Sequence, residues 1–182
     1  MNKPANLYES HLALRECSLL PGGEWRPTLP GWSLIQISRG TGYWLQSQSR
    51  TELETGSVLL AAGNQSGYVR ASLLGDLTLQ CFNLIPSRLT GLFTLGELDS
   101  LKQAATRPEL AFQVLAPNEP VAVKMTELCT RQNRDSLLSR LNLLQLVVEI
   151  LDKELEQTAP NQESEQVDAR ERLRQFLAET PP

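Results

Sequence analysis

The first half of the chain alternates short apolar runs with turn residues, which is the pattern of β-strands. The run 32–38 reads WSLIQIS, and the turn 39–42 that follows contains two glycines. Glycine adopts positive backbone φ angles at little cost and so favours tight turns. Further short strands are expected at 43–46, 57–60, 68–71 and 77–85, with turn signals about every eight to twelve residues. This spacing predicts a β-sandwich or small barrel over residues 23–86.

The second half changes to a helical repeat. Between residues 137 and 155 one row of apolar residues recurs at intervals of four and three, and a shorter row lies about a quarter turn away. Asp135–Ser136 is suited to cap the start of this helix. A shorter helix is expected from Pro120 to about Gln132. The first row is Leu137, Leu141, Leu144, Val148, Leu151 and Leu155, and the second is Leu143, Val147 and Ile150.

Together the two rows make an apolar stripe wider than one packing seam requires. A subunit that buries one row against its own barrel leaves the other exposed, and a long exposed apolar stripe usually marks a partner. We therefore expect a homodimer through a parallel or antiparallel coiled contact. The alternative is that both rows are buried within one subunit. The expected dimerisation residues are Leu137, Leu141, Leu144, Val148 and Leu151.

Composition limits the class of protein. The 182 residues are 41% hydrophobic, which supports one compact domain with a core. A net charge of −4 argues against a chain that grips DNA itself. No apolar run approaches about 18 residues, so we expect no membrane span. The start, MNKPA, lacks the apolar core of a signal peptide, so we expect a cytoplasmic protein.

Residues for catalysis or metal binding are scarce. The chain has one histidine, His11, and three cysteines without a CxxC spacing. A cupin metal centre needs two or three histidines and a carboxylate, so we expect no metal, no cofactor and no disulfide framework. Nothing in the sequence builds an enzyme. The aromatic residues of the β half instead suit a small-molecule pocket, and Arg26, held extended by Pro27, offers a fork of donors. The alternative is that these aromatics are core and Arg26 is solvated.

The order of motifs resembles the sensory domain of AraC-type (AraC/XylS) bacterial transcription regulators. The long leucine-rich helix takes the place of that family's dimerisation helix. The resemblance covers most of residues 23–86 and, more loosely, 120–157. The motifs that carry it are Arg26-Pro27, Gly31-Trp32, Arg39-Gly40-x-Gly42, Leu53-x-x-Gly56-Ser57-Val58-Leu59-Leu60, Gly63, Tyr68 and the strand ending at Pro86.

The resemblance implies a mainly β plus α fold, a cupin-like double-stranded β-helix (jelly-roll) barrel followed by a helical dimerisation segment. The barrel with its N-terminal arm would span 1–116, the dimerisation helices 117–157, and residues 158–182 a linker and the start of a DNA-binding domain absent from this chain. The family binds a small-molecule effector in the barrel and reads DNA with a C-terminal helix-turn-helix. The arm around Pro4, Leu7 and Tyr8 would fold over the pocket.

The family's effector contacts map onto individual positions. Arg26 and Tyr68 match two positions that contact sugar in the arabinose sensor. Leu79 and Cys81 stand where that sensor has a histidine and a tryptophan, which implies an effector more apolar than arabinose, or no effector. The expected ligand-binding residues are Arg26, Trp32, Trp44, Tyr68, Leu79 and Cys81.

Two other functions remain open from the sequence. A metal-free cupin enzyme or binding protein acting on a small metabolite would need an acid–base group inside the barrel, and Glu52 and Glu54 are the nearest candidates. A scaffold with a filled barrel would function through its helices alone.

Overall fold

The fold comes from a computed structural model that describes residues 11–27, 31–46, 49–63, 66–89, 91–130 and 136–152. The N-terminal arm with Pro4, Leu7 and Tyr8, the Asp135 half of the helix cap, Leu155 and the segment 158–182 lie outside these residues.

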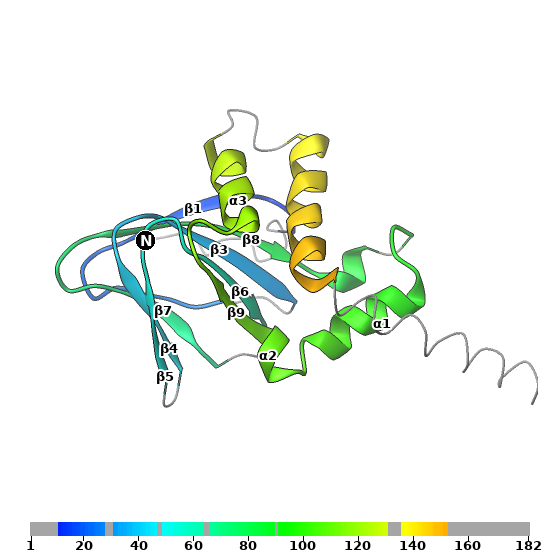
Figure 1. Cartoon of the computed structure of the whole chain (residues 1–182), viewed down its shortest axis with the longest axis horizontal. Coiled ribbons are helices and arrows are strands. Elements are labelled where there is room, and N and C mark those ends of the chain that lie inside the picture. The colour runs from blue at the N-terminus through cyan, green and yellow to red at the C-terminus, as the bar shows by residue number, and fades with distance from the viewer. Residues whose placement is uncertain are drawn as a thin grey trace, which may run out of the picture.

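In the described part of the chain, nine strands form two antiparallel sheets (Figure 1). Sheet A has the order β1 (Arg15–Leu19), β8 (Leu77–Leu84), β3 (Trp32–Arg39), β6 (Val58–Ala62) and β9 (Phe112–Leu115). Sheet B has the order β2 (Glu24–Trp25), β7 (Tyr68–Ala71), β4 (Gly42–Gln46) and β5 (Ser49–Leu53). The prediction of a β plus α fold is confirmed at this level.

The first eight strands pair in a nested order. Strand β4 pairs with β5, β3 with β6, β2 with β7 and β1 with β8, so the chain folds back on itself as a double ribbon. Two further pairings, β3 with β8 and β4 with β7, join neighbouring turns of the ribbon within each sheet. Successive strand pairs along the ribbon therefore lie alternately in sheet A and sheet B.

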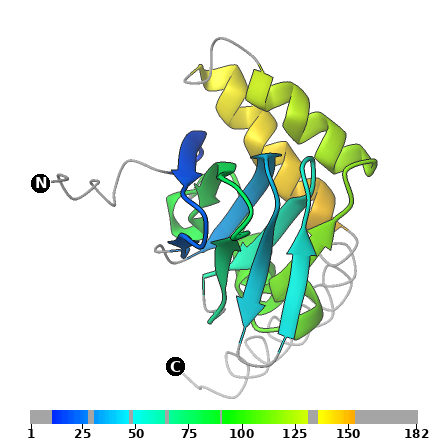
Figure 2. The same ribbon diagram turned by 90° about the vertical axis from the view of Figure 1, so that its left-hand side faces the viewer.

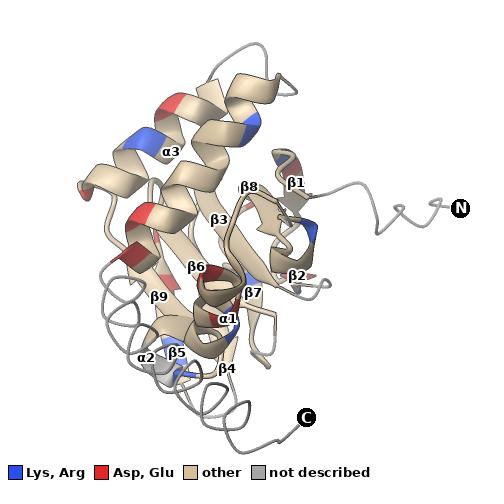
Figure 3. Cartoon of the chain, turned by 90° about the vertical axis from the view of Figure 1, so that its right-hand side faces the viewer, with Lys and Arg blue, Asp and Glu red and all other residues tan. Residues whose placement is uncertain are grey.

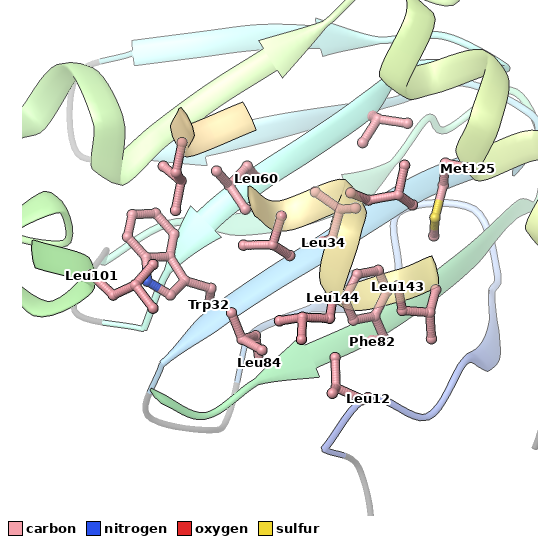
Figure 4. Packing of buried hydrophobic residues seen from close by; sticks show 14 of the residues in the cluster. Leu12, Trp32, Leu34, Leu60, Phe82, Leu84, Leu101, Met125, Leu143 and Leu144 are labelled. Carbon is pink, nitrogen blue, oxygen red and sulfur yellow. The ribbon is translucent and has the colours of Figure 1, made fainter. Parts of the chain in front are cut away.

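Hydrophobic side chains fill two separate layers. One cluster lies between the two sheets, and the other lies between sheet A and the helices. Strand β3 supplies both, because Ile35 and Ile37 belong to the first cluster while Trp32 and Leu34 belong to the second. Successive side chains of a strand point to opposite faces, so a strand covered on both sides carries apolar residues on both faces. Figure 4 shows Leu34, Phe82, Met125 and Leu143 meeting in the second cluster.

The helices cover sheet A. α1 (Leu95–Ala104) and α2 (Pro108–Ala111) precede β9, and η1 (Pro86–Arg88) is a short 3₁₀ turn after β8. α3 (Pro120–Thr130) and a helix over 137–152 lie side by side, as Figures 1 and 2 both show. Both predicted helices are therefore present. Among the described residues, no helix has the length and apolar character that crossing a membrane requires.

Polar contacts fix the helical pair. The Nζ of Lys124 donates to both carboxylate oxygens of Glu149 at 2.7 and 2.8 Å, which lowers the pKa of Glu149. The Nε2 of Gln36 on β3 donates to Oγ1 of Thr126 at 2.5 Å and so ties α3 to sheet A. The Oγ of Ser136 accepts the backbone N–H of Ser139 at 3.1 Å, the contact expected of the predicted N-cap.

The helix 137–152 buries a different set of residues from the one predicted. Leu143, Leu146 and Val147 are buried, and so are Leu144 (7% exposed) and Leu151 (0%), which belong to the predicted intersubunit row. Leu144 and Leu151 lie in the same cluster as sheet A, so the prediction that they face a partner is corrected. The apolar side chains left exposed are Leu137 (73%), Leu138 (64%) and Leu141 (47%).

His11 holds the described N-terminal end of the chain against β8. Its Nδ1 accepts the backbone N–H of Ile85 at 3.0 Å, and the N–H of Leu12 donates to the carbonyl of Asn83 at 2.8 Å. Burial lowers the pKa of His11, and the positive charges of Arg88 and Arg140 lower it further. The imidazole is therefore held neutral, as an acceptor at Nδ1 must be.

We expect His11 to make stability depend on pH. Because the folded state holds the pKa of His11 below 6.5, the unfolded chain takes up the proton first as the pH falls. The contribution of His11 is fully present above that value and is lost as the pH falls through the lowered pKa. Urea unfolding at about pH 7 and about pH 5.5 should show this loss in the parent and less of it in His11→Asn, whose amide oxygen replaces Nδ1 as acceptor. An equal loss in both proteins would contradict the prediction.

Candidate functional site

A cavity of about 490 Å³ lies between one end of sheet A and α1. This volume lies within the range of small-molecule sites in proteins. Its walls come from the start of β3, the ends of β6 and β8, η1 and α1. The lining residues are Gly31, Trp32, Gly63, Ile85, Pro86, Ser87, Leu101, Lys102, Ala105 and Thr106.

Local geometry explains why glycine and tryptophan open β3. Gly31 has φ of +110°, and a Cβ built on it would lie 2.2 Å from the carbonyl oxygen of Leu84, so only glycine fits. The carbonyl of Gly31 accepts the N–H of Gly63 at 2.5 Å, which joins the two loops at the cavity edge. Trp32 then turns its indole toward Leu101 of α1, as Figure 4 shows.

The helix α1 forms the opposite wall. It begins with a capping box, in which Oγ1 of Thr94 accepts the N–H of Glu97 at 3.2 Å and the Glu97 carboxylate accepts the N–H of Thr94 at 2.7 Å. This cap fixes the start of the helix, and the buried Leu98 and Leu101 fix its inner face.

The cavity is lined mainly by apolar side chains, together with the cationic side chain of Lys102. Trp32, Ile85, Pro86, Leu101 and Ala105 supply most of the wall. Lys102 is exposed at the edge, and its ammonium group forms no ion pair with any of the residues that the structure describes. Such a site suits an apolar molecule with an anionic end, because the cation offers a partner to a carboxylate.

The structure separates the predicted ligand-binding residues into three places. Trp44, Leu79 and Cys81 lie between the sheets. Trp32 faces the other side of sheet A and lines the cavity beside α1.

Arg26 and Tyr68 occupy the third place. The Arg26 guanidinium lies 4.7 Å from the centre of the Tyr68 ring. Val69 and Ala71 on the same strand point into the core between the sheets, so Tyr68 faces outward. The expected cavity lined by Arg26 and Tyr68 inside the barrel is therefore wrong.

Hydrophobic side chains occupy the space between the sheets. Trp44 is fully buried, and its ring stacks on Phe112 with centroids 5.2 Å apart. Its Nε1 has no hydrogen-bond partner among the described residues. Burial raises the pKa of Cys81 to about 11, so its thiol stays protonated at neutral pH and is a poor nucleophile.

The two candidate acid–base residues do not face this interior. Glu52 and Glu54 are both exposed. Within the described ranges, histidine, cysteine and carboxylate side chains do not gather in groups of three that suit a metal ion. Neither observation supports a cupin-type catalytic centre in this part of the chain.

No protein-family model and no curated protein matches this sequence. Solved structures do match. ToxT from Vibrio cholerae superposes with a TM-score of 0.51 at 9% identity, covering 79% of this chain and 58% of that one. ToxT bound to (E)-4-(8-methylnaphthalen-1-yl)but-3-enoic acid gives a TM-score of 0.50 at 9% identity over the same shares. The chain shares its fold with an AraC-family regulator.

A second regulator is similar at a lower score. CuxR, an AraC-like transcriptional activator, gives a TM-score of 0.48 at 14% identity, covering 82% of this chain and 53% of that one. The chain spans between 54% and 58% of the ToxT chains it matches. At these identities the likeness shows a shared fold.

Proposed function

We propose that this chain is the ligand-sensing and dimerisation domain of an AraC-type transcription regulator. In this role it controls DNA binding by a helix-turn-helix domain outside the chain, and it works in the cytoplasm where the DNA lies. The net charge of −4 supports DNA binding by a separate domain, because a negative charge disfavours direct contact between this chain and DNA phosphates. Figure 3 shows acidic and basic residues interspersed over α3, its neighbouring helix and α1, rather than a basic face.

The nested strand pairing supports a cupin-like jelly roll, the architecture that the sequence resemblance implies. In a jelly roll, eight strands form two facing sheets by folding a double ribbon twice. The pairs β1–β8, β2–β7, β3–β6 and β4–β5 follow that order. Strand β9 adds to the edge of sheet A beyond this set.

The observation that carries the sensing function is the cavity beside α1. It lies between sheet A and α1, because Trp32 comes from the sheet while Leu101 and Lys102 come from that helix. A molecule bound there contacts both parts and can shift their relative placement if it binds one arrangement better. The ToxT complex contains an apolar carboxylic acid, and we propose an effector of that chemistry here, its carboxylate near Lys102.

Dimerisation is proposed through the exposed part of the helix 137–152. Leu137, Leu138 and Leu141 lie within one turn of each other and are exposed by 73%, 64% and 47%. Leucines exposed together on a helix that is otherwise packed are typical of a protein contact. The half-buried Val148 lies farther along and can extend the contact.

A thermal-shift titration with the acid that ToxT binds tests the sensing function. A ligand that binds only the folded state raises the melting temperature. We expect the parent to show this rise and Ala105→Phe, which fills the cavity, to lose it. Ala116→Phe makes the same change at an exposed loop position and should keep it. A panel of aromatic and medium-chain carboxylic acids extends the screen.

The proposed function fails on either of two results. One is that none of these acids shifts the parent. The other is that Ala105→Phe responds as strongly as Ala116→Phe.

A further inference from the structure

The outer face of sheet B carries an ordered set of aromatic and charged side chains. The strand register aligns Glu24, Arg70, Tyr43 and Glu52 across β2, β7, β4 and β5. The next row aligns Tyr68, Leu45 and Arg50. This face lies on the side of the molecule away from the helical pair and from the cavity beside α1 (Figures 1 and 2).

Part of this face is hollowed into a second cavity of about 510 Å³. Two guanidinium groups, those of Arg50 and Arg70, line it together with Tyr43. Three leucines, Leu45, Leu73 and Leu74, supply apolar surface.

The two arginines are available to a ligand. Arg50 lies 3.7 Å from the centre of the Tyr43 ring, a stacked position that restricts the guanidinium without using its N–H donors. Within the described residues, neither Arg50 nor Arg70 forms an ion pair or a hydrogen bond through its side chain. Glu24, the cross-strand neighbour of Arg70, lies instead 3.7 Å from Arg26.

The leucines are exposed although the turn that carries them is fixed. Leu73 is 75% exposed and Leu74 is 98% exposed. The N–H of Leu74 donates to Oγ of Ser72 at 3.2 Å, and the N–H of Ser72 donates to the carbonyl of Thr41 at 3.0 Å. The turn therefore holds two apolar side chains in water beside two arginines that lack carboxylate partners.

We propose that this cavity binds an amphiphilic organic anion, a carboxylate or phosphate monoester on a short aliphatic chain. The anionic group accepts hydrogen bonds from Arg50 and Arg70, whose planar forks match its oxygens. The chain lies on Leu45, Leu73 and Leu74, which removes their surface from water. The site goes beyond the proposed effector cavity, because it lies on the other sheet and shares no residue with it.

Isothermal titration with octyl phosphate and octanoate tests the proposal. We expect both to bind, while inorganic phosphate and octanol, which each lack one half of the molecule, bind at least about tenfold more weakly. Arg70→Gln should weaken octyl phosphate by about tenfold at this site, and the double change of Arg50 and Arg70 to glutamine should leave only the binding that Lys102→Gln removes. Leu74→Ser should weaken it through the aliphatic chain. Arg140→Gln, an exposed arginine on the helix 137–152, should have no effect.

A variant of the cavity beside α1 distinguishes this proposal from the proposed function. If Lys102→Gln weakens octyl phosphate while the Arg50 and Arg70 variants do not, the ligand lies beside α1, and the site on sheet B is overturned while the sensing function stands. Equal binding by inorganic phosphate and octyl phosphate would also overturn it.

A flotation assay distinguishes a lipid from a free anion. If the site serves a lipid headgroup, vesicles of phosphatidylcholine with phosphatidic acid carry the parent but not the double arginine variant. If it serves a soluble anion, octyl phosphate binds and the vesicles carry neither. Vesicles that carry both proteins equally would contradict a role for the arginines.

Discussion

Replacing Trp44 by alanine is expected to lower the free energy of unfolding by about 3–5 kcal/mol. The indole is fully buried between the two sheets and stacks on Phe112. Its removal leaves an apolar cavity that the surrounding strands cannot close. Such cavities stay dry and bind small aromatic molecules, so indole added to Trp44→Ala should restore part of the lost stability. Urea unfolding of the parent and the variant, with and without indole, measures both effects.

Two further variants show whether the indole fills the space. Trp44→Phe keeps most of the packing and removes the Nε1 donor that has no partner among the described residues, so it should cost less than Trp44→Ala. A Cβ at Gly67 would lie 2.0 Å from Cζ2 of Trp44. Gly67→Ala should therefore be strongly destabilising, and less so when combined with Trp44→Phe, which lacks that atom. If Trp44→Ala keeps the parent's stability and no indole binds, the space between the sheets is not packed.

The second large effect separates the exposed first turns of the helix 137–152 from its buried part. Leu144→Glu should lower the free energy of unfolding by about 3–5 kcal/mol, because it removes a buried leucine and places a carboxylate in an apolar cluster. Leu141→Glu should leave this free energy within about 0.5 kcal/mol, because Leu141 is 47% exposed. In sedimentation experiments Leu141→Glu should instead convert the expected dimer to a monomer.

A neighbouring variant with the same change in net charge serves as the control. Arg140 neighbours Leu141 and is exposed, so Arg140→Gln should alter neither stability nor oligomeric state. Two results count against the arrangement. A stable Leu144→Glu would show that the helix does not pack on sheet A as described, and a Leu141→Glu protein that remains a dimer would place the dimer contact elsewhere.

The strands with clear turn signals could be predicted from the sequence. The runs at 32–38, 43–46, 57–60, 68–71 and 77–85 correspond to β3, β4, β6, β7 and β8. Strands β1 and β5 were not predicted, because their sequences RECSL and SRTEL contain few apolar residues. The helix α1 was not predicted either, although the spacing of Thr94 and Glu97 is the signature of a capping box.

The site was harder to predict than the strands, because its residues depend on which face of a strand each side chain occupies. Strand β3 is apolar on both faces, so its sequence does not tell whether Trp32 points between the sheets or toward the helices. On β7 the alternation was informative, since Val69 and Ala71 are apolar while Arg70 is charged. That pattern already places Tyr68 on the outer face with Arg70.

The predicted dimerisation row of the helix 137–152 was partly wrong for a similar reason. Leu137, Leu141, Leu144, Val148 and Leu151 share a repeat, but the helix lies on a sheet of limited extent. Its first turns extend past the apolar surface and leave Leu137 and Leu141 exposed, while Leu144 and Leu151 reach the core. Periodicity gives the face of a helix but not the length over which a neighbour covers that face.

The most direct test of the account observes the three tryptophan indole N–H signals by NMR while the acid that ToxT binds is added. Trp25, Trp32 and Trp44 can be assigned by changing each to phenylalanine. Trp32 lines the cavity beside α1, whereas Trp44 lies between the sheets. We expect the Trp32 signal to shift in proportion to bound ligand while the Trp44 signal stays in place. A shift of Trp44 with Trp32 unchanged would contradict it, because the effector would then lie between the sheets.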